Sequence, residues 1–338
     1  MMLGIRSLGA PVPPAPDVYF SSLYGTACQI ETGGTWHTLT DDSGDWQLPF
    51  LVSSIPGQTE LFDASSPYGY AGIAVNPDLP ASDQQAMWES AKGILREAGV
   101  VSLFLRHSPL VHTMPAQHLG QHLTVVPDHP TVAVPISTPD EMWKSLEGRS
   151  RTAIRKAQKS GLTSLVRPAT KEDLHPHGPF RRLYEATMHR VRAKKGYFFS
   201  DMYYVALLES LGSDLQLVEV QDSQGKPAAA ALLLRHNQTL HYHLSGSEPL
   251  HARVGANNLL IWQAMLWSAQ NGLRRLHLGG GVGTNDALLR FKKSFGGELL
   301  SFAATGHIID PARYQRLVNQ MRNTPLPTST FFPAYRSG

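Results

Sequence analysis

The residues best suited to chemistry lie between positions 277 and 297, in the sequence HLGGGVGTNDALLRFKKSFGG. A short apolar strand, residues 273–278, runs into three glycines, which would let a ligand or a second backbone approach closely. Asp286 stands where a helix N-cap is expected, and the short helix after it would carry Phe291 and Lys292. An ammonium group held rigidly beside a glycine-lined cleft can stabilise negative charge that develops during a reaction. The alternative is a plain strand–turn–helix connection with a surface lysine.

Two further groups of side chains in the first half could bind a substrate. Tyr68, Gly69 and Tyr70 follow a strand, although aromatic residues beside glycine also suit ordinary strand packing. Arg106 ends another strand, where its guanidinium fork could hold a carboxylate or a phosphate.

The elements that would position these groups follow a pattern that repeats once. The first half offers a helix (21–30), a hairpin (36–55), a glycine-rich strand region (62–74), a helix (82–98) and a strand (100–105). The second half offers helices 179–192 and 200–211, a hairpin (215–234), a strand (239–245), a helix (257–271) and a strand (273–278). Glycine follows both final helices, as is common at helix ends. This order predicts an α/β fold with mixed sheets (α+β) covered by helices, and a domain boundary near residues 136–139.

The segment 277–297 also resembles a known family. The pattern L-H-L-G-G-G, an acidic residue, then F-K-x-x-F and glycine is similar to the C-terminal signature of the FemAB-like branch of the GNAT acyltransferases. Further similarities are spread over nearly the whole chain: SPYGY at 66–70, IRKA at 154–157, YFF at 197–199 and FFPAYR at 331–336. The resemblance implies two tandem GNAT-like domains, residues 1–136 on the acceptor side and residues 137–338 as the better conforming core.

The resemblance also implies roles for individual residues. Lys292 matches the family lysine at the transfer site, where it would stabilise an oxyanion or the leaving ribose oxygen. Phe291 would be its neighbour, and Asp286 would orient the amine or Lys292, unless it is only an N-cap. Tyr68, Gly69 and Tyr70 resemble the acceptor-side motif, and Arg106 would meet an acidic acceptor group. The substrate-binding candidates of the second half are Tyr197, Phe199, Tyr242, Gly279, Gly280 and Gly281.

Positive charge is concentrated in one segment. The whole chain has a net charge of +3, yet residues 148–195 hold thirteen Lys or Arg and three Asp or Glu, a local +10. The spacing i, i+4, i+8 would align Arg151, Arg155 and Lys159 as a stripe that follows phosphates without reading bases. The alternative is two solvated helix faces. The RNA-binding candidates are Arg149, Arg151, Arg155, Lys156, Lys159 and Arg253.

The loop HARVGAN, residues 251–257, bears on the acyl donor. GNAT enzymes hold the coenzyme A pyrophosphate at a helix N-terminus through a Q/R-x-x-G-x-G/A loop, and the spacing here is wrong by one residue. FemAB-like relatives take the acyl group from aminoacyl-tRNA instead, so aminoacyl-tRNA is the expected donor and no cofactor is expected. Arg253 and Gly255 could still hold an anion, which keeps an acyl-CoA-dependent N-acyltransferase as an alternative. A non-catalytic protein that binds RNA or a peptide is a second alternative.

The composition also argues against several other classes of protein. No run of about 18 apolar residues is present, so no membrane span is expected. The N-terminus lacks the apolar region of a signal peptide. The one cysteine, Cys28, excludes an internal disulfide and favours a cytoplasmic setting. His241 and His243 would share one strand face, but no third ligand is nearby, so no metal is expected.

Together these features predict a cytoplasmic aminoacyl-tRNA-dependent aminoacyltransferase. It would form an amide or peptide bond on the amine of a small acceptor. The acceptor is expected to be a biosynthetic intermediate or a peptide rather than a cell-wall precursor, because no helical arm is evident.

Overall fold

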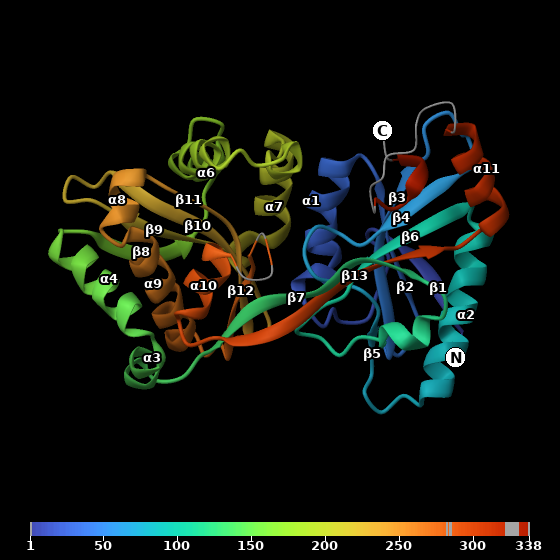
Figure 1. Ribbon diagram of the computed structural model, residues 1–338, viewed down its shortest axis with the longest axis horizontal. Coiled ribbons are helices and arrows are strands. Elements are labelled where there is room, and N and C mark those ends of the chain that lie inside the picture. Colours follow the sequence, from blue (N-terminus) through green and yellow to red (C-terminus); the bar gives the residue numbers. More distant parts are fainter. Residues whose placement is uncertain (1, 282, 284–285, 322–330, 337–338) are drawn as a thin grey trace. The chain divides into compact units, whose positions relative to one another are not determined.

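The computed structural model describes residues 2–281, 283, 286–321 and 331–336 (Figure 1). The chain forms two compact units, one of residues 1–129 with 301–338 and one of residues 130–300. The sequence predicts one boundary near residue 136, whereas the last residues return to the first unit. Thr284 and Asn285, which lie between the three glycines and the expected N-cap at Asp286, are outside the described residues.

The first unit is built on a mixed sheet. Its strands are β1 (Gly4–Ser7), β2 (Thr35–Thr40), β3 (Trp46–Ser54), β4 (Phe62–Ser65), β5 (Ala74–Val75), β6 (Val100–Arg106) and most of β13 (Glu298–Ile308). They are ordered β1-β2-β3-β4-β6-β13, with β5 beside β3, and the β4–β6 pair is parallel. The helical elements are η1 (Val18–Phe20), α1 (Ser22–Thr32), α2 (Ala81–Glu97), η2 (Ala116–Leu119), α11 (Pro311–Met321) and η5 (Ala334–Arg336).

Strand β6 shows how this sheet is covered. Leu103 and Leu105 pack in one cluster with Trp88 of α2, whereas Phe104, between them, packs against another cluster that contains Tyr314 of α11. Because alternate residues of a strand point to opposite faces, α2 and α11 cover opposite faces of the sheet. Both faces of the strand that leads to Arg106 are therefore buried.

The second unit is also a mixed sheet. Its strands are β7 (Leu123–Pro135, in part), β8 (Thr163–Pro168), β9 (Leu215–Gln221), β10 (Pro227–His236), β11 (Thr239–Ser247) and β12 (Arg275–Gly280). They are ordered β7-β12-β11-β10-β9-β8, and β11–β12 is the parallel pair. The helical elements are α3 (Pro139–Ser145), α4 (Gly148–Lys159), α5 (Lys171–Leu174), α6 (Pro179–Arg190), η3 (Lys195–Tyr197), α7 (Asp201–Leu211), η4 (Gly212–Asp214), α8 (Pro249–Arg253), α9 (Ala256–Gln270) and α10 (Ala287–Lys293).

Helices cover both faces of this second sheet. Ala231 and Leu233 of β10 pack in one cluster with Ile154 of α4 and Leu260 of α9. On the opposite face Gly246 of β11 lies so close to α6 that a Cβ built there would overlap with the carbonyl of Leu183. Glycine at this position therefore sets how closely α6 packs on β11.

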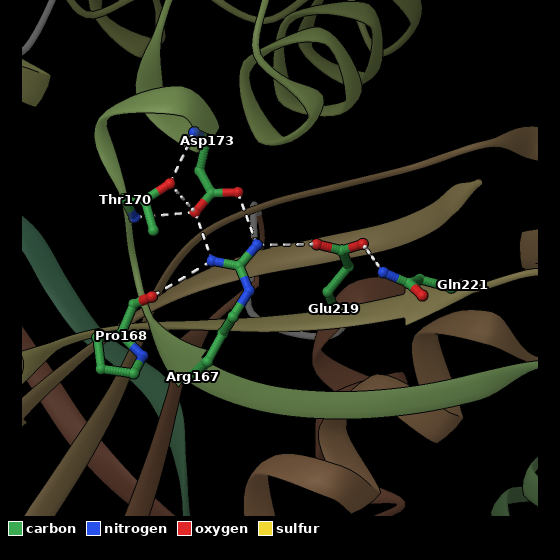
Figure 2. A network of polar contacts seen from close by, with 6 residues as sticks. All are labelled: Arg167, Pro168, Thr170, Asp173, Glu219 and Gln221. Atoms are coloured by element: carbon green, nitrogen blue, oxygen red, sulfur yellow. Dashed lines mark hydrogen bonds and ion pairs between the residues drawn. The ribbon is translucent and has the colours of Figure 1, made fainter. Parts of the chain in front are cut away.

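A buried ion network joins β8, α5 and β9 at the edge of the second sheet (Figure 2). Arg167 Nη1 lies 2.6 Å from Asp173 Oδ2, and its Nη2 lies 3.5 Å from Glu219 Oε2. Both carboxylates are almost completely buried, which requires a cationic partner. Arg167 thus neutralises charge inside the unit and is not available to an external polyanion.

Candidate active site

The candidate site lies where the parallel strands β11 and β12 separate. They pair from Thr239–Arg275 to His241–His277 and no further. Beyond that point β11 continues along β10 to Ser247, while β12 continues along β7 to Gly280. Gly279, with φ at +70°, and Gly280 belong to this separated end of β12.

A β-bulge shapes the β11 side of this split. Leu232 pairs with Leu244 and Leu233 pairs with Tyr242, so His243 has no partner in the register. The bulge interrupts the alternation of side chains and places Tyr242 and Ser245 on one face. Burial raises the pKa of Tyr242 to about 12, and a hydrogen bond with Ser245 opposes that shift in part. Tyr242 therefore presents a neutral phenol at the split.

Lys292 of α10 connects the two separated strands. Its side chain is buried, with an exposed fraction of 8%. Nζ donates a hydrogen bond of 2.6 Å to the carbonyl oxygen of Gly280 and lies 6.0 Å from the centroid of the Tyr242 ring. Burial lowers the pKa of Lys292 to about 8, although the charge of Asp286 opposes this shift. The site therefore holds an ammonium group that loses its proton more readily than an exposed lysine does.

Asp286 is the N-cap of α10. Its Oδ1 accepts from the amide of Leu289 and its Oδ2 from the amide of Gly283, both at 2.7 Å. A Cβ on Gly281 would overlap with this carboxylate, so glycine is needed for the loop to close over it. Asp286 thus fixes the loop and the start of the helix that carries Lys292.

Phe291 is half-buried on α10 and contacts Phe295 edge to face at 5.3 Å. Both rings pack against the core cluster of the second unit. The pair fixes the orientation of α10, and therefore the direction of the Lys292 side chain.

The residues expected to form an aminoacyl pocket do not form one wall. Phe199 is buried and stacks on Tyr203 at 4.4 Å, and the Tyr203 hydroxyl lies 2.8 Å from His243 Nε2. Tyr197 is exposed, and its carbonyl accepts from the hydroxyl of Tyr184 at 2.7 Å. Burial lowers the pKa of His243 to about 3, so this histidine is neutral near pH 7.

The Tyr203–His243 pair is a feature that sequence reasoning missed. Its members lie 40 residues apart, and no local spacing signals their contact. His241 is buried against His277 of β12, with ring centroids 5.6 Å apart, on the face opposite to Tyr242. The expectation that His241 and His243 share one strand face is therefore wrong, because the bulge at His243 interrupts the alternation of side chains. Among the described residues, no group of three or more His, Cys, Asp or Glu side chains is arranged to hold a metal ion.

In the first unit, the acceptor-side candidates belong to an aromatic cluster. The carbonyl of Tyr68 accepts from the Tyr24 hydroxyl at 2.8 Å, and Tyr70 contacts Phe302 edge to face at 5.0 Å. Gly69 has φ at +123°, and a Cβ there would overlap with the Tyr19 ring. The conformation and the contact both require glycine.

Arg106 is the last residue of β6 and is partly exposed. Its guanidinium lies over the ring of Phe104 at 5.4 Å, and its backbone amide donates to Ser66 Oγ at 3.0 Å. The side chain therefore rests on an apolar surface and keeps N–H groups available for a polar ligand.

The predicted cationic stripe on α4 is only partly a surface feature. Arg151 is half-buried and donates to the carbonyls of Trp143, Lys144 and Leu146 at the end of α3. Arg155 is exposed and lies over the Trp143 ring at 5.2 Å, and Lys159 is exposed. The stripe of three is thus reduced to two, because the first member caps a helix.

The remaining RNA-binding candidates also make backbone contacts. Arg149 donates to the carbonyl of Arg290 at 2.8 Å and pairs with Glu147, and Lys156 donates to the carbonyl of Arg253 at 3.1 Å. Arg253 itself is exposed at the end of α8. All of these side chains except Arg151 remain accessible at the surface.

Residues 144–293 match the family model described as an acetyltransferase (GNAT) domain. This segment, which lies within the second unit, is therefore a GNAT domain. The match contains both separating strands, β11 and β12, and the helix α10 that carries Lys292. No curated protein matches this chain.

Solved structures show the fold of nearly the whole chain. FemX has a TM-score of 0.71 at 16% identity, over 90% of this chain and 95% of that chain. The C-terminal domain of a candidate lysylphosphatidylglycerol synthetase from Agrobacterium fabrum has a TM-score of 0.53 at 11% identity, over 86% and 88% of the two chains. A tandem GNAT protein from the clavulanic acid biosynthesis pathway has a TM-score of 0.52 at 12% identity, over 88% and 90%. The predicted FemAB-like tandem GNAT fold, with mixed α/β architecture, is confirmed. Within the described part of the chain, no helix combines the length and the apolar composition needed to cross a bilayer.

Proposed function

We propose that this acyltransferase moves an amino acid from aminoacyl-tRNA to the amine of a small acceptor in the cytoplasm. The acceptor nitrogen attacks the ester carbonyl, the amide bond forms, and the ester bond to the ribose oxygen breaks. The amine loses a proton and the ribose hydroxyl regains one. The acceptor is a biosynthetic intermediate or a peptide, and the amide or peptide bond is the product.

The placement of Lys292 is the observation that carries this proposal. Its ammonium lies at the split, between the Gly280 carbonyl and the Tyr242 ring, on a helix held by Asp286 and Phe291. An ester is already activated, so the enzyme must mainly align the amine and stabilise the oxyanion. An ammonium with a pKa near 8 can do the latter and can also protonate the leaving ribose oxygen.

Two features support RNA as the donor. Arg155 and Lys159 are exposed cations of α4, and Arg253 is an exposed cation of α8. The loop that would hold a pyrophosphate is crowded, because a Cβ on Gly255 would overlap with the carbonyl of Ala153 in α4. Gly255 and Ala256 are both buried against that helix, which leaves less room for a nucleotide diphosphate.

The test is a coupled assay that contains the acyltransferase, a synthetase, ATP, an amino acid and candidate amines, with products detected by mass spectrometry. Lys292→Ala should lower transfer by about a hundredfold or more, because one charge-stabilising donor is lost. Lys293→Ala is the matched control, because Lys293 is the next residue and its side chain is exposed. This variant should transfer normally. RNase should abolish product formation. Full activity in Lys292→Ala, or product that resists RNase, contradicts the proposal.

An acyl-CoA-dependent N-acyltransferase is the second candidate function. Helix α9 begins after Gly255 with no side-chain cap, so its first N–H groups are open to an anionic group. Saturable binding of coenzyme A that is lost in Arg253→Glu, with transfer that resists RNase, would favour this function. Transfer by either route excludes the non-catalytic alternative.

A further inference from the structure

The turn between α6 and α7 is a cationic surface of the second unit. We call residues 190–197, RVRAKKGY, the cationic turn. Its four charged side chains, Arg190, Arg192, Lys194 and Lys195, are all exposed. Within the described residues none of the four makes an ion pair. The turn contains no acidic residue, so its charge is +4.

The two carboxylates that flank this turn share one internal arginine. Arg181 is buried, with its Nη2 2.6 Å from Glu185 and its Nη1 3.0 Å from Asp201. The same guanidinium lies over the Tyr204 ring at 4.3 Å. Arg181 offsets one of these two negative charges, so the flanking residues leave a charge of −1 beside the +4 of the cationic turn.

The cationic turn is held in shape by its own backbone. The amide of Ala193 donates to the carbonyl of Met188 at 3.0 Å, and the amide of Tyr197 donates to the carbonyl of Lys194 at 3.0 Å. The carbonyl of Tyr197 accepts from Tyr184. The Tyr197 side chain is 43% exposed and Val191 is 60% exposed. The same short turn thus carries one exposed aromatic ring and four exposed cations.

The cationic turn is anchored to the strand that leads to the candidate site. Arg190 Nη2 donates to the carbonyl of Ser247 at 3.1 Å, and the amide of Ser247 donates to Thr187 Oγ1 at 3.0 Å. Ser247 is the last residue of β11, and Tyr242, beside Lys292, lies five residues earlier. At about 3.3 Å per strand residue, Ser247 and Tyr242 are roughly 15 Å apart.

We propose that the cationic turn binds the single-stranded 3′ end of the donor RNA, with phosphates on the four cations and a base on the Tyr197 ring. Exposed aromatic rings beside cations are the means by which proteins hold unpaired nucleotides. From this position the terminal ester can reach Lys292 along β11. A membrane-binding surface would instead need a continuous apolar face, whereas Val191 and Tyr197 are separated by cations in the sequence of the turn. The inference rests on the proposed function.

The test measures binding of a fluorescent single-stranded RNA with the tRNA 3′ sequence to the full chain, by anisotropy at several salt concentrations. Lys194→Glu with Lys195→Glu should weaken binding at least tenfold. It should also flatten the plot of log affinity against log salt by about 0.7 for each lost phosphate contact. Tyr197→Ala should weaken binding roughly tenfold without changing the slope, because stacking is not ionic.

The matched control is Arg182→Glu with Lys226→Glu, which changes the net charge equally at exposed sites outside the cationic turn. It should bind RNA like the wild type. Normal RNA binding by the Lys194/Lys195 variant overturns the proposal. The proposal is also overturned if the wild type does not bind RNA but binds phosphatidylglycerol vesicles through the same lysines.

These outcomes separate the cationic turn from the proposed function. If the wild type transfers an amino acid from charged tRNA while the Lys194/Lys195 variant binds RNA normally, only the assignment of RNA binding to the cationic turn is wrong. If the wild type binds RNA through the cationic turn but transfers an amino acid from no charged tRNA, the RNA-binding assignment is supported and the proposed function is wrong.

Discussion

At the scale of single residues, the site combines one unusual lysine with ordinary structural groups. Lys292 is buried, and its ammonium is held by one backbone carbonyl and the face of one ring. Asp286 makes two capping bonds to backbone amides, as its position before the helix predicted. Its further role in orienting the amine remains a prediction. The sequence identified both residues but could not show that Lys292 is buried, because burial depends on strands distant in the chain.

Lys292→Met should stabilise the protein while it removes transfer. Burial lowers the lysine pKa from 10.5 to about 8, so holding the ammonium in the folded state costs about 3 kcal/mol near pH 7. Loss of the hydrogen bond to Gly280 costs about 1 kcal/mol, which leaves a net gain of about 2 kcal/mol.

The unfolded lysine binds a proton more tightly than the folded one between the two pKa values. Wild-type stability should therefore rise with pH from about 8 to about 10.5, and the advantage of Lys292→Met should shrink over that range. Urea unfolding at several pH values measures both effects, with the exposed Lys293→Met as the control. If Lys292→Met instead loses the same stability at every pH, burial does not destabilise the charged form of Lys292.

At the scale of elements, propensity and end signals located the helices and hairpins well. Helix α2 was predicted at 82–98 and spans Ala81–Glu97, and the predicted hairpins at 36–55 and 215–234 are formed by β2 with β3 and by β9 with β10. Strands β7, β8 and β13 and helix α11 were not predicted, because their stability depends on tertiary pairing more than on local pattern. The bulge at His243 was also beyond local signals.

Helix α4 separates two kinds of cation that look alike in sequence. Arg151→Leu should lower the stability of the second unit by about 1–3 kcal/mol, because three carbonyls at the end of α3 lose their donor. Lys159→Glu should leave stability within about 0.5 kcal/mol of the wild type and should weaken tRNA binding. Thermal melts and anisotropy with full-length tRNA measure the two effects. A stable Arg151→Leu that binds tRNA poorly would restore the predicted stripe of three.

At the scale of the whole molecule, the end of the chain completes the first unit. Asp63 of β4 accepts from Ser102 Oγ at 2.9 Å, from the Tyr335 hydroxyl and from Arg336 Nε. Phe332 lies against β13 so closely that a Cβ on Gly306 would overlap with its ring. Residues more than 230 positions apart thus share one buried carboxylate. A buried carboxylate without these donors would be costly.

Arg336→Met should destabilise the first unit by about 1–3 kcal/mol, because a largely buried Asp63 oxygen loses a charged donor. The matched control is Arg6→Met, which removes the exposed Arg6–Asp42 pair and should cost less than about 1 kcal/mol. Urea unfolding followed by near-ultraviolet circular dichroism measures the difference. Equal effects in the two variants would show that the C-terminal contact is no stronger than a surface ion pair.

The sequence by itself determined the order of most elements, the glycine-rich turn, the N-cap at Asp286 and the lysine after it. These depend on neighbours within a few residues, where backbone conformation and hydrogen bonding are local. Only the tertiary structure decided which cations remain free, since Arg151, Arg167 and Arg181 find their partners within the fold. It also decided that Lys292 lies between two separating strands, because pairing between distant segments, not local pattern, creates that split.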